Sequence, residues 1–567
     1  MTDIRRSILW VIFGFSMVLL WDKWQVHNGN KATFFPQPTE QKAAATGEAG
    51  KPANGDVPTP SAVPGAQPTA AGASAPTAPR ETVEVTSDVL RLTFDSEGGS
   101  LVRADILQHK AATLSSKNQE DKPLTLLTQT ADHTYVAQSG LVGAPGSQLP
   151  THKTPMKLVA ADKELTDSKN ELTVRFESGD VGGAKLVKTY TVRRGGYDIG
   201  VKHEVVNTGT APITPQLYMQ LVRDGSTTAS ETPFYSTFTG PAVYTNEKKY
   251  QKIEFPDIEK KKADFVKTSS DGYVAMVQHY FASAWLLGEG IEREHYARKV
   301  DNNLYAAGMM TAVGTLAPGE AKAVEARLFV GPQAEKVLEA VAPGLELVKD
   351  YGWLTMLAKP LYWLMEKIHG FVDNWGWSIV LLVVLIKAAF YWLNATAYRS
   401  MAKMKAINPR IMDMRERLKD NPQQMQQEMM RIYREEKVNP MGGCFPIMIQ
   451  IPVFIALYWV LLSSVEMRNA PWTMWITDMS SPDPYYILPL VMTLTTVIQT
   501  ALNPLPPDPM QAKLMWIMPL VFSVMFFFFP SGLVLYWITN NVLTIAQQAY
   551  INNRMGVPVK FTIPSFK

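Results

Sequence analysis

Hydrophobic and polar positions are distributed unevenly along this chain. Up to about residue 345, short stretches such as residues 90–94 (LRLTF) alternate between apolar and polar side chains at the two-residue period of a β-strand. From residue 376 onward, continuous apolar runs dominate instead. Because a helix needs about 20 consecutive apolar residues to cross a bilayer, the pattern predicts a β-rich polar part followed by a part built of membrane helices.

Residues 81–345 are predicted to form a large all-β sandwich, since alternating stretches are separated by Gly-, Asn- and Asp-containing turns. The histidines His203 and His279 lie singly within strand patterns, and no pair of carboxylates is placed for acid–base catalysis. Trp285 is the only tryptophan of this region, which gives little support for sugar binding. We therefore expect a domain without catalytic residues, metal site or cofactor.

Five apolar runs between residues 376 and 550 are predicted as transmembrane helices. They span residues 376–396, 444–462, 485–502, 514–529 and 532–549. A sixth is expected at residues 1–24, where Arg5 and Arg6 precede an apolar run that lacks a small-residue cleavage site, as in an uncleaved signal anchor. The distribution of Lys and Arg in the loops places both termini in the cytoplasm. The fold class is thus a polytopic α-helical membrane protein with six spans.

The segments that flank the β sandwich have compositions of their own. Residues 25–80 are rich in Pro, Ala, Gly and Thr and are predicted to be a disordered periplasmic linker. Residues 350–372 place apolar side chains at helical spacing, with Lys and Glu on the other side, and predict an amphipathic helix at the membrane surface. A helix packed on the sandwich is the alternative. Residues 551–567 form a basic cytoplasmic tail.

Residues 397–442 are polar and carry ten basic residues against six acidic ones, so this segment is expected in the cytoplasm. The pairs Asn408-Pro409 and Asn421-Pro422 each have the form of an N-cap followed by a first-turn proline, and they predict a hairpin of helices at about 409–419 and 422–437. The side chains expected to form a docking surface are Met404, Arg410, Arg415, Arg417, Met425 and Met429. The methionines could equally be the hairpin's own core.

Lys387 lies near the middle of the run 376–396. In a straight helix, ~15 Å of axis would separate it from the charged residues after Ala397, at ~1.5 Å per residue. That is about half of a ~30 Å hydrocarbon core, where a lysine costs a few kcal/mol. A lysine stem reaches only ~6 Å, too short for snorkelling to the interface. We therefore favour a wet, protein-lined cavity around Lys387, with snorkelling as the alternative.

Polar side chains recur on single faces of two other predicted spans. Tyr536, Asn540, Thr544 and Gln547 share a face of the last span. Thr493, Thr496 and Thr500 share a face of the span 485–502, with Gln499 beside it, while Gln450 and Asn394 lie in two further spans. These positions indicate a hydrophilic cavity, and ordinary interhelical hydrogen bonding is the alternative.

Charge and motifs exclude several classes of function. The formal net charge is +3 and no basic stripe is present, so direct nucleic-acid binding is not expected. There is no GxxxxGK[ST] loop for nucleotide hydrolysis. The single cysteine, Cys444, excludes a disulfide framework and falls at the predicted cytoplasmic edge of a span. A secondary transporter or channel that uses Lys387 as a counter-ion remains open, although no internal repeat is visible.

Several longer motifs resemble one known family. They are NPMGGCFPIMIQIPVFIALYWVL (439–461), DPYYILPL (483–490), DPMQAKLMWIMP (508–519), FPSGLVLYWITNN (529–541) and, in the external domain, GYVAMVQHYFASAW (272–285). These stretches resemble the bacterial membrane protein insertase family YidC, in its Gram-negative form with a large periplasmic domain. The resemblance covers nearly the whole chain.

The resemblance implies an inner-membrane insertase and chaperone with a hydrophilic groove open to the cytoplasm, working with or without the Sec translocon. Implied partners are nascent membrane proteins, the ribosome, Sec translocon components and the phospholipid bilayer. Lys387 stands where many Gram-negative members carry arginine, so the charge is kept and the bidentate fork is not. Val383 and Trp537 stand where a threonine and a second tyrosine are familiar. The expected groove residues are Lys387, Asn394, Gln450, Thr496, Gln499, Tyr536, Trp537, Asn540 and Thr544.

Overall fold

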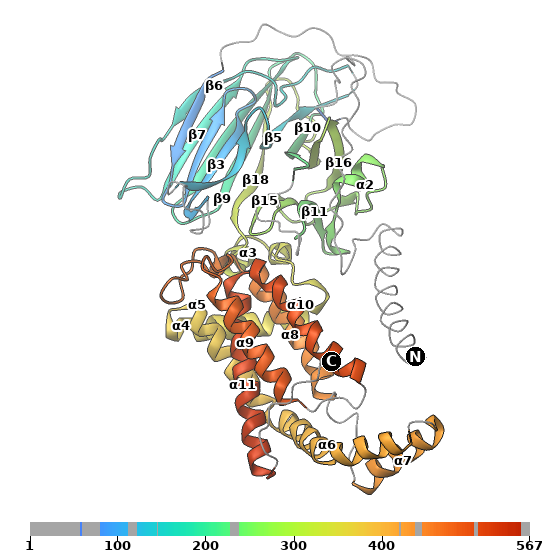
Figure 1. Ribbon diagram of the computed structural model, residues 1–567. Helices are drawn as coiled ribbons and strands as arrows, with labels where there is room; N and C mark the ends of the chain where they lie inside the picture. The colour runs from blue at the N-terminus through green and yellow to red at the C-terminus, as the bar shows by residue number, and fades with distance from the viewer. Residues whose placement is uncertain are drawn as a thin grey trace.

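The structure of the protein is a computed structural model that describes residues 57–58, 80–111, 122–144, 146–226, 237–418, 421–436, 445–503 and 509–556. The predicted signal anchor, most of the predicted linker, Cys444 and the end of the predicted tail lie outside the described residues. A β-rich body occupies one end of the molecule, a helical bundle lies below it, and a hairpin of two helices projects from the opposite end of the bundle (Figure 1).

Two antiparallel sheets make up the β-rich body, each of nine strands within the described ranges. The first contains, in spatial order, β1 (Thr82–Thr86), β2 (Leu90–Asp95), β3 (Ser100–Lys110), β4 (Pro123–Gln129), β5 (Thr134–Val142), β10 (Gln216–Asp224), β17 (Leu304–Ala312), β16 (Arg293–Asp301) and β13 (Thr268–Ser269). The second contains β12 (Lys249–Lys252), β11 (Gly240–Thr245), β14 (Tyr273–Val277), β15 (Phe281–Leu287), β18 (Ala321–Pro332), β9 (Asp198–Asn207), β8 (Ala184–Arg193), β7 (Glu171–Ser178) and β6 (Met156–Ala161).

The two sheets bury one common apolar core. In β7 the side chains alternate between exposed and buried, as the two-residue period requires, whereas β14 and β15 are buried along their whole length. Aromatic side chains from both sheets meet in this core, for example Phe94 and Tyr190 with ring centroids 4.6 Å apart. The predicted all-β sandwich is therefore confirmed.

Helices follow the sandwich, with one short helix inserted in it. They are α2 (Phe255–Glu259), α3 (Glu335–Val341), α4 (Thr355–Val372), α5 (Trp375–Ala389), α6 (Tyr391–Arg417), α7 (Pro422–Glu435), α8 (Phe445–Ser463), α9 (Ile487–Leu502), α10 (Pro509–Met525) and α11 (Ser531–Arg554), with 3-10 turns η1 (Leu345–Val348), η2 (Gly352–Leu354), η3 (Val465–Met467) and η4 (Phe526–Phe528). Helix α11 packs against α5, α6, α8 and α9 and is the centre of the bundle.

The predicted spans correspond to helices, with one exception in shape. The runs 444–462, 485–502, 514–529 and 532–549 coincide with α8, α9, α10 with η4, and α11, although α11 continues to Arg554. Taken singly, none of the described helices is both long enough and apolar enough for a membrane crossing; α5 and α6 qualify only as a pair, and they are bent by 69° at their junction.

The straight helix predicted for residues 376–396 is therefore wrong, because the chain bends at Phe390. Contacts to α11 hold both sides of the bend: Lys387 Nζ donates to Thr544 Oγ1, and Gln547 Nε2 donates to the backbone carbonyl of Tyr391. Lys387 thus lies in the last turn of α5, where the negative end of the helix dipole favours a cation. The half-depth estimate made for Lys387 assumed a straight helix and no longer follows.

A second correction concerns the predicted hairpin. No helix begins at Pro409, because α6 runs through this proline and the proposed cap at Asn408 is not one. A proline inside a helix costs ~3 kcal/mol, which is offset by packing on both sides of it, since Ile407 and Ile411 are buried against α7. The cap at Asn421 is present, and its side chain accepts a hydrogen bond from the Gln424 amide.

The helix predicted for residues 350–372 is α4, and it packs along one side of the bundle. Ala358, Tyr362 and Met365 are buried against α5 and α8, while Trp363 and Phe371 are exposed. The alternative of a helix packed on the sandwich does not hold as stated, since most contacts of α4 are to other helices. An exposed aromatic face is what a helix at a membrane surface presents, and that location remains a prediction.

Polar contacts join the sandwich to the bundle. The side chain of Lys349, which follows η1, is fully buried, and its Nζ lies 3.4 Å from a carboxylate oxygen of Glu466 in η3. Tyr362 of α4 donates a 2.6 Å hydrogen bond to the same carboxylate. Between β14 and β15, His279 Nε2 donates to the carbonyl of Leu462 at the end of α8, at 2.8 Å. These contacts form the domain joint.

Candidate functional site

Among the described residues of α4 to α11, Lys387 is the most buried cation, with a residue exposure of 8%. Its Nζ donates a 2.9 Å hydrogen bond to Thr544 Oγ1 of α11. Within the described ranges Lys387 forms no ion pair with a carboxylate. A lysine ammonium has three N–H donors, so two of them remain for water or for a ligand. Lys387 is therefore placed to attract an anionic or strongly polar group.

Buried polar side chains line α11 on both sides of this contact. Asn541, Thr544, Gln548 and Asn552 recur at intervals of three or four residues and are all buried. Asn541 Nδ2 donates to Thr495 Oγ1 at 3.2 Å and to Thr496 Oγ1 at 3.0 Å, which links α11 to α9. This set is the polar stripe of α11.

Two amide side chains near this stripe keep hydrogen-bonding capacity. Asn394 of α6 is 4% exposed, and its Nδ2 has no partner among the described residues. The same holds for Oδ1 of Asn540 on α11. A buried polar atom without a partner costs about 1–3 kcal/mol, so such atoms persist where water or a ligand completes them.

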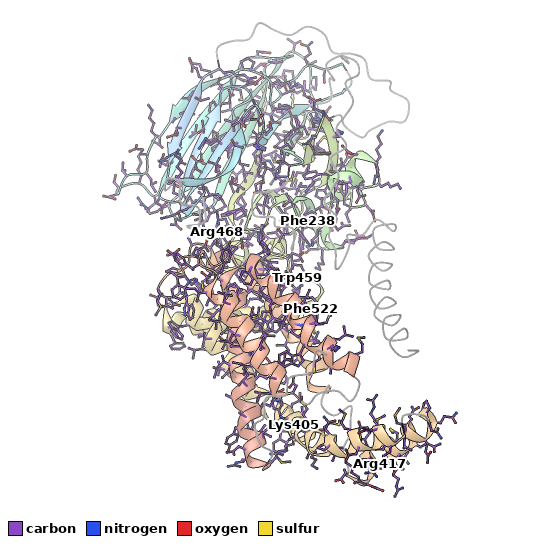
Figure 2. All side chains as sticks on the ribbon, in the orientation of Figure 1. Phe238, Lys405, Arg417, Trp459, Arg468 and Phe522 are labelled. Atoms are coloured by element: carbon purple, nitrogen blue, oxygen red, sulfur yellow. The ribbon has the colours of Figure 1, made fainter. Side chains whose placement is uncertain are left out.

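An apolar cavity of about 570 Å³ lies on the neighbouring side of α11, between α8, α9 and α10. Trp537 contacts Phe454 there, with ring centroids 4.7 Å apart, and Thr496 contributes a polar edge. Trp459 and Phe522, which also line the cavity, are labelled on the bundle in Figure 2. Thr496 therefore belongs both to the cavity wall and, through Asn541, to the polar stripe.

The predicted groove residues fall into two groups. Lys387 and Thr544 meet directly; Asn394 lies on α6, and Asn540 lies on α11 one turn before Thr544. Thr496 and Trp537 line the apolar cavity, and Tyr536 packs in the apolar core beside Phe454, with ring centroids 5.6 Å apart. Gln450 and Gln499 are half-buried, and among the described residues no hydrogen bond joins either of them to Lys387.

Asn541 and Gln548 were not among the predicted groove residues. The predicted face of Tyr536, Asn540, Thr544 and Gln547 shares Thr544 with the buried stripe, but Asn540 and Gln547 each lie one residue away from the stripe positions Asn541 and Gln548. Extending the search to i, i+3 and i+7 from Asn541 would have found the stripe. Tyr398 of α6 was also missed, and its side chain interacts with that of Thr544.

The hairpin residues are placed mainly inside their own small core. Met404, Met425 and Met429 pack, half-buried, against a cluster formed by Ile407, Ile411, Met414 and Ile432. Arg410 pairs with Glu435 and Glu436 of the end of α7, each at 3.0 Å. Arg417 is exposed near the end of α6, as labelled in Figure 2, and Arg415 is half-buried. The exposed apolar side chains of the hairpin are instead Met412 and Met430.

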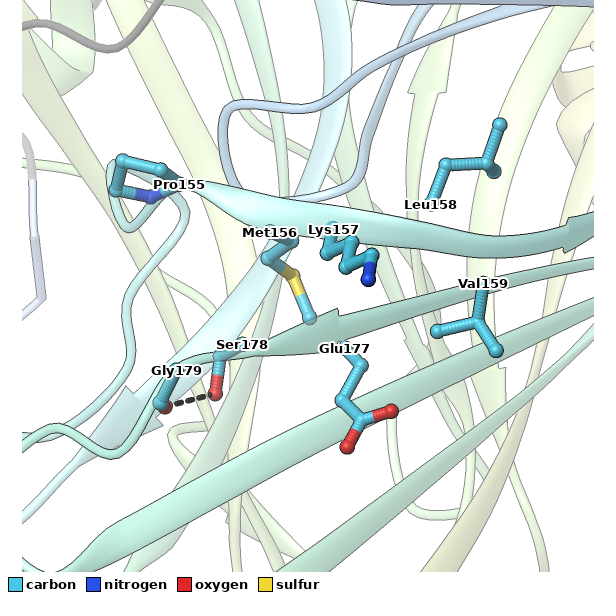
Figure 3. A pocket seen from close by; sticks show the side chains of 8 residues that line it. All are labelled: Pro155, Met156, Lys157, Leu158, Val159, Glu177, Ser178 and Gly179. Atoms are coloured by element: carbon cyan, nitrogen blue, oxygen red, sulfur yellow. Dashed lines mark hydrogen bonds between the residues drawn. The ribbon is translucent and has the colours of Figure 1, made fainter.

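A second hollow, of about 640 Å³, opens at the edge of the sandwich between β6 and β7 (Figure 3). Its lining includes Met156, Val159 and Glu177. The polar side chains shown there do not converge on one point, and the only hydrogen bond drawn joins Ser178 to the adjacent Gly179 carbonyl. No chemistry is assembled at this edge by the residues in view.

Two protein-family models match successive parts of this chain. The family model described as the YidC periplasmic domain matches residues 82–364, and the one described as the 60Kd inner membrane protein matches residues 367–557. A protein of Cupriavidus necator named membrane protein insertase YidC is 53% identical over 561 residues, covering 98% of both chains. One of the same name from Ralstonia nicotianae is 52% identical, covering 98% of this chain and 99% of that protein.

Among solved structures, the crystal structure of an active YidC insertase with its first transmembrane domain resolved has a TM-score of 0.37 and 17% identity, covering 82% of this chain and 91% of the other. The sandwich, the helical bundle and the two matched family models define an inner-membrane protein with a periplasmic domain. The chain belongs to the membrane protein insertase family YidC.

Proposed function

We propose that this protein inserts and folds integral membrane proteins, and that Lys387 with the polar stripe of α11 receives the hydrophilic part of the incoming chain. The observation that carries this proposal is the buried ammonium of Lys387 inside the helical bundle, which donates to the Thr544 hydroxyl and is unpaired with any described carboxylate. The names of the relatives point to the same activity.

The physical task is to move a short hydrophilic segment through hydrocarbon. An unpaired ammonium in a medium of low dielectric attracts a carboxylate more strongly than it would in bulk water. The free donor of Asn394 and the free acceptor of Asn540 offer hydrogen bonds to the same segment. Both kinds of contact reduce the desolvation cost that a polar backbone pays inside a membrane.

The apolar cavity serves the second step, in which the apolar part of the client is removed from water. A client helix must leave the polar stripe and bury its apolar side chains, at ~25 cal/mol per Å² of apolar surface removed from water. Phe454, Phe526 and Trp537 give the cavity an aromatic wall next to the stripe. Transfer from stripe to cavity to lipid needs no nucleotide.

The proposal also assigns the sandwich and the hairpin to opposite sides of the membrane. The sandwich and the hairpin α6–α7 lie at opposite ends of the bundle, which fits a periplasmic domain and a cytoplasmic docking element on a multi-pass protein with both termini inside (Figure 1). We expect the exposed side chains of the hairpin, among them Arg417, Met412 and Met430, to meet the ribosome and the emerging chain. The sandwich faces Sec translocon components and the phospholipid surface.

A transporter or channel that uses Lys387 as a counter-ion is the rival function. Such a protein would need a continuous polar path, whereas the side of α11 next to the stripe is an apolar cavity. Purified protein in liposomes separates the two functions: the proposal expects insertion of a small test membrane protein without solute flux, and flux without insertion would establish the rival.

Thiol labelling tests whether water reaches Asn540, which lies on α11 beside the polar stripe. In a background in which Cys444 is replaced by serine, cysteine at Asn540 should react with a membrane-impermeant thiol reagent added from the cytoplasmic side, because reaction requires a hydrated thiolate. Cysteine at Val542 is the matched control: this residue is exposed on the same helix and would face lipid. Cysteine at Val534, in the apolar core, is the second control. Equal labelling at Asn540 and Val542 would refute a groove.

A further inference from the structure

Two residues of the predicted disordered linker lie on the sandwich. Val57 packs against a small cluster formed by Val142 of β5, Tyr218 of β10 and Met310 of β17, and Pro58 is buried. The prediction of a wholly disordered linker does not hold for these two residues. Val57 is one of the few branched apolar side chains in a segment composed mostly of Pro, Ala, Gly and Thr.

The cluster is on the outer face of the first sheet. Leu217 and Met219, the neighbours of Tyr218 along β10, point into the common core, so Tyr218 points to the opposite side. Tyr218 is nevertheless fully buried, as is Met310 at 4% exposure. An outer sheet face that is this well buried requires a cover.

Two tyrosines make this face flat and aromatic. Tyr218 is in register with Gly140 of β5, and its hydroxyl lies so close above that glycine that a Cβ there would meet it at 2.6 Å. Tyr296 of β16 covers Gly308 of β17 in the same way, also at 2.6 Å. Because both glycines lack a side chain, the rings can approach the sheet. We call Tyr218, Tyr296, Met310 and Val142 the tyrosine platform.

His152 fixes one of these rings. Its amide donates to the Tyr218 hydroxyl at 3.0 Å, and its Nδ1 lies 2.6 Å from the same oxygen. The polar edge of Tyr218 is thus engaged by the sandwich itself, and the apolar part of the platform is left for Val57 and Pro58. Aromatic surfaces of this kind bind proline-containing extended segments, because proline already restricts the backbone and little entropy is lost on docking.

We propose that the tyrosine platform is a docking site for the chain's own linker, held at Val57-Pro58. Proline restrains the residue before it to extended conformations, which presents the Val57 side chain to the platform. Docking at Val57-Pro58 shortens the sequence between the predicted anchor and its first contact with the sandwich from residues 25–80 to residues 25–56. Chains of these two lengths that behave as flexible coils of ~5–6 Å × √n have r.m.s. spans of ~40 Å and ~30 Å.

Docking of Val57-Pro58 on the tyrosine platform therefore limits the distance between the sandwich and the predicted N-terminal anchor. It also occupies an aromatic surface that would otherwise bind extended segments of other chains. The linker carries its own control, since Val63-Pro64 repeats the dipeptide six positions further on. The described contacts place Val57, from the first dipeptide, on the platform.

The first test is protection of a thiol on the platform. The full-length protein carries Cys444→Ser and Met310→Cys, and its modification by a water-soluble maleimide is timed. Replacing Val57-Pro58 by Asp-Gly should accelerate modification at least tenfold, because the cover is removed. Replacing Val63-Pro64 by Asp-Gly should leave the rate unchanged. Equal rates in all three linkers would overturn the proposal, since something other than this dipeptide would then cover the platform.

The second test does not depend on tolerance of a cysteine in the cluster. Cysteines at Val57 and at half-buried Tyr296 should be joined by a short bifunctional maleimide in intact protein, with a yield several-fold above that of the pair Val63 and Tyr296. Similar yields from both pairs would mean that the linker merely samples the surface, and the proposal would fail. Crosslinking between molecules rather than within one would assign the platform to a second copy and equally refute it.

Discussion

The domain joint between sandwich and bundle gives a prediction whose size follows from the structure. Replacing Lys349 by methionine keeps the length of the side chain and removes its charge. The Glu466 carboxylate, 3.4 Å away, then loses its cation while it keeps the hydrogen bond from Tyr362. Lys349 Nζ also lies 3.9 Å from the centroid of the Tyr362 ring, so a cation–π contact is lost with it.

Two estimates limit the stability that Lys349→Met should remove. Two unit charges 3.4 Å apart attract by ~5 kcal/mol at an effective dielectric constant of 20, before desolvation is counted. Removing one partner of a buried pair costs ~3–5 kcal/mol, and the 18% exposure of the Glu466 side chain lowers this. We expect about 3 kcal/mol for Lys349→Met, a decrease of ~6–12 °C in apparent melting temperature at ~2–4 °C per kcal/mol.

Differential scanning fluorimetry of the purified protein measures this change. Lys169→Met is the matched control: Lys169 and Asp162 are closer, at 2.8 Å, but 55% and 33% exposed, so that loss should stay below ~1 kcal/mol. The double variant Lys349→Met/Glu466→Gln should be less destabilised than the sum of the single variants, by ~1 kcal/mol or more. A Lys349→Met shift no larger than the Lys169→Met shift would refute the reasoning.

Three further predictions concern other parts of the chain. Burial lowers the pKa of Lys188 from 10.5 to about 7, so between these pH values the unfolded chain binds more protons than the folded chain. The free energy of unfolding should therefore rise with pH across this window, by up to ~1.4 kcal/mol per pH unit. Lys188→Met should abolish the increase of melting temperature between pH 7 and 9. Asn541→Leu should cost ~1–3 kcal/mol by removing the donor shared by two α9 threonines, whereas Val542→Ala should stay near ~0.5 kcal/mol in the same melting assay. Arg410→Ala breaks only exposed ion pairs and should leave the hairpin folded, while Ile411→Asp should unfold it; protease resistance of the hairpin distinguishes the two.

The sandwich and the positions of the bundle helices were predictable from local patterns. Strand alternation and apolar run length are properties of a few consecutive residues, and both survive in the folded chain. The cap at Asn421 was predictable for the same reason, because the N-cap geometry needs only residues three apart.

The bend at Phe390 and the continuous helix through Pro409 were not predictable in this way. Neither Phe390 nor its neighbours carries a helix-breaking residue, and the bend is held by Gln547 and Thr544, more than 150 positions away in the sequence. At Pro409 the local signal was strong, but burial of Ile407 and Ile411 against α7 outweighs it. In both cases tertiary contacts decide between alternatives that the local sequence leaves close in energy.

The candidate site was predictable in part. A lysine inside an apolar run identified Lys387, and the face shared by Thr544 identified its partner. Asn541 and Gln548 were overlooked because polar side chains of the last span fit two neighbouring faces that share Thr544, and the local sequence does not show which face is buried against the other helices. The docking of Val57-Pro58 was also missed, because composition averages over the linker and two residues do not change an average.

The charge at Lys387 is the central claim, and one assay tests it directly. Purified protein with Lys, Arg, Met or Glu at position 387 is reconstituted into liposomes, and insertion of a test membrane protein is measured with an acidic translocated segment and with its Asn/Gln counterpart. We expect Lys387→Arg to retain insertion. Lys387→Glu should slow the acidic client at least tenfold, which corresponds to ~1.4 kcal/mol, and should affect the neutral client little. Equal insertion of both clients by Lys387→Glu and by the unmodified protein would contradict the account.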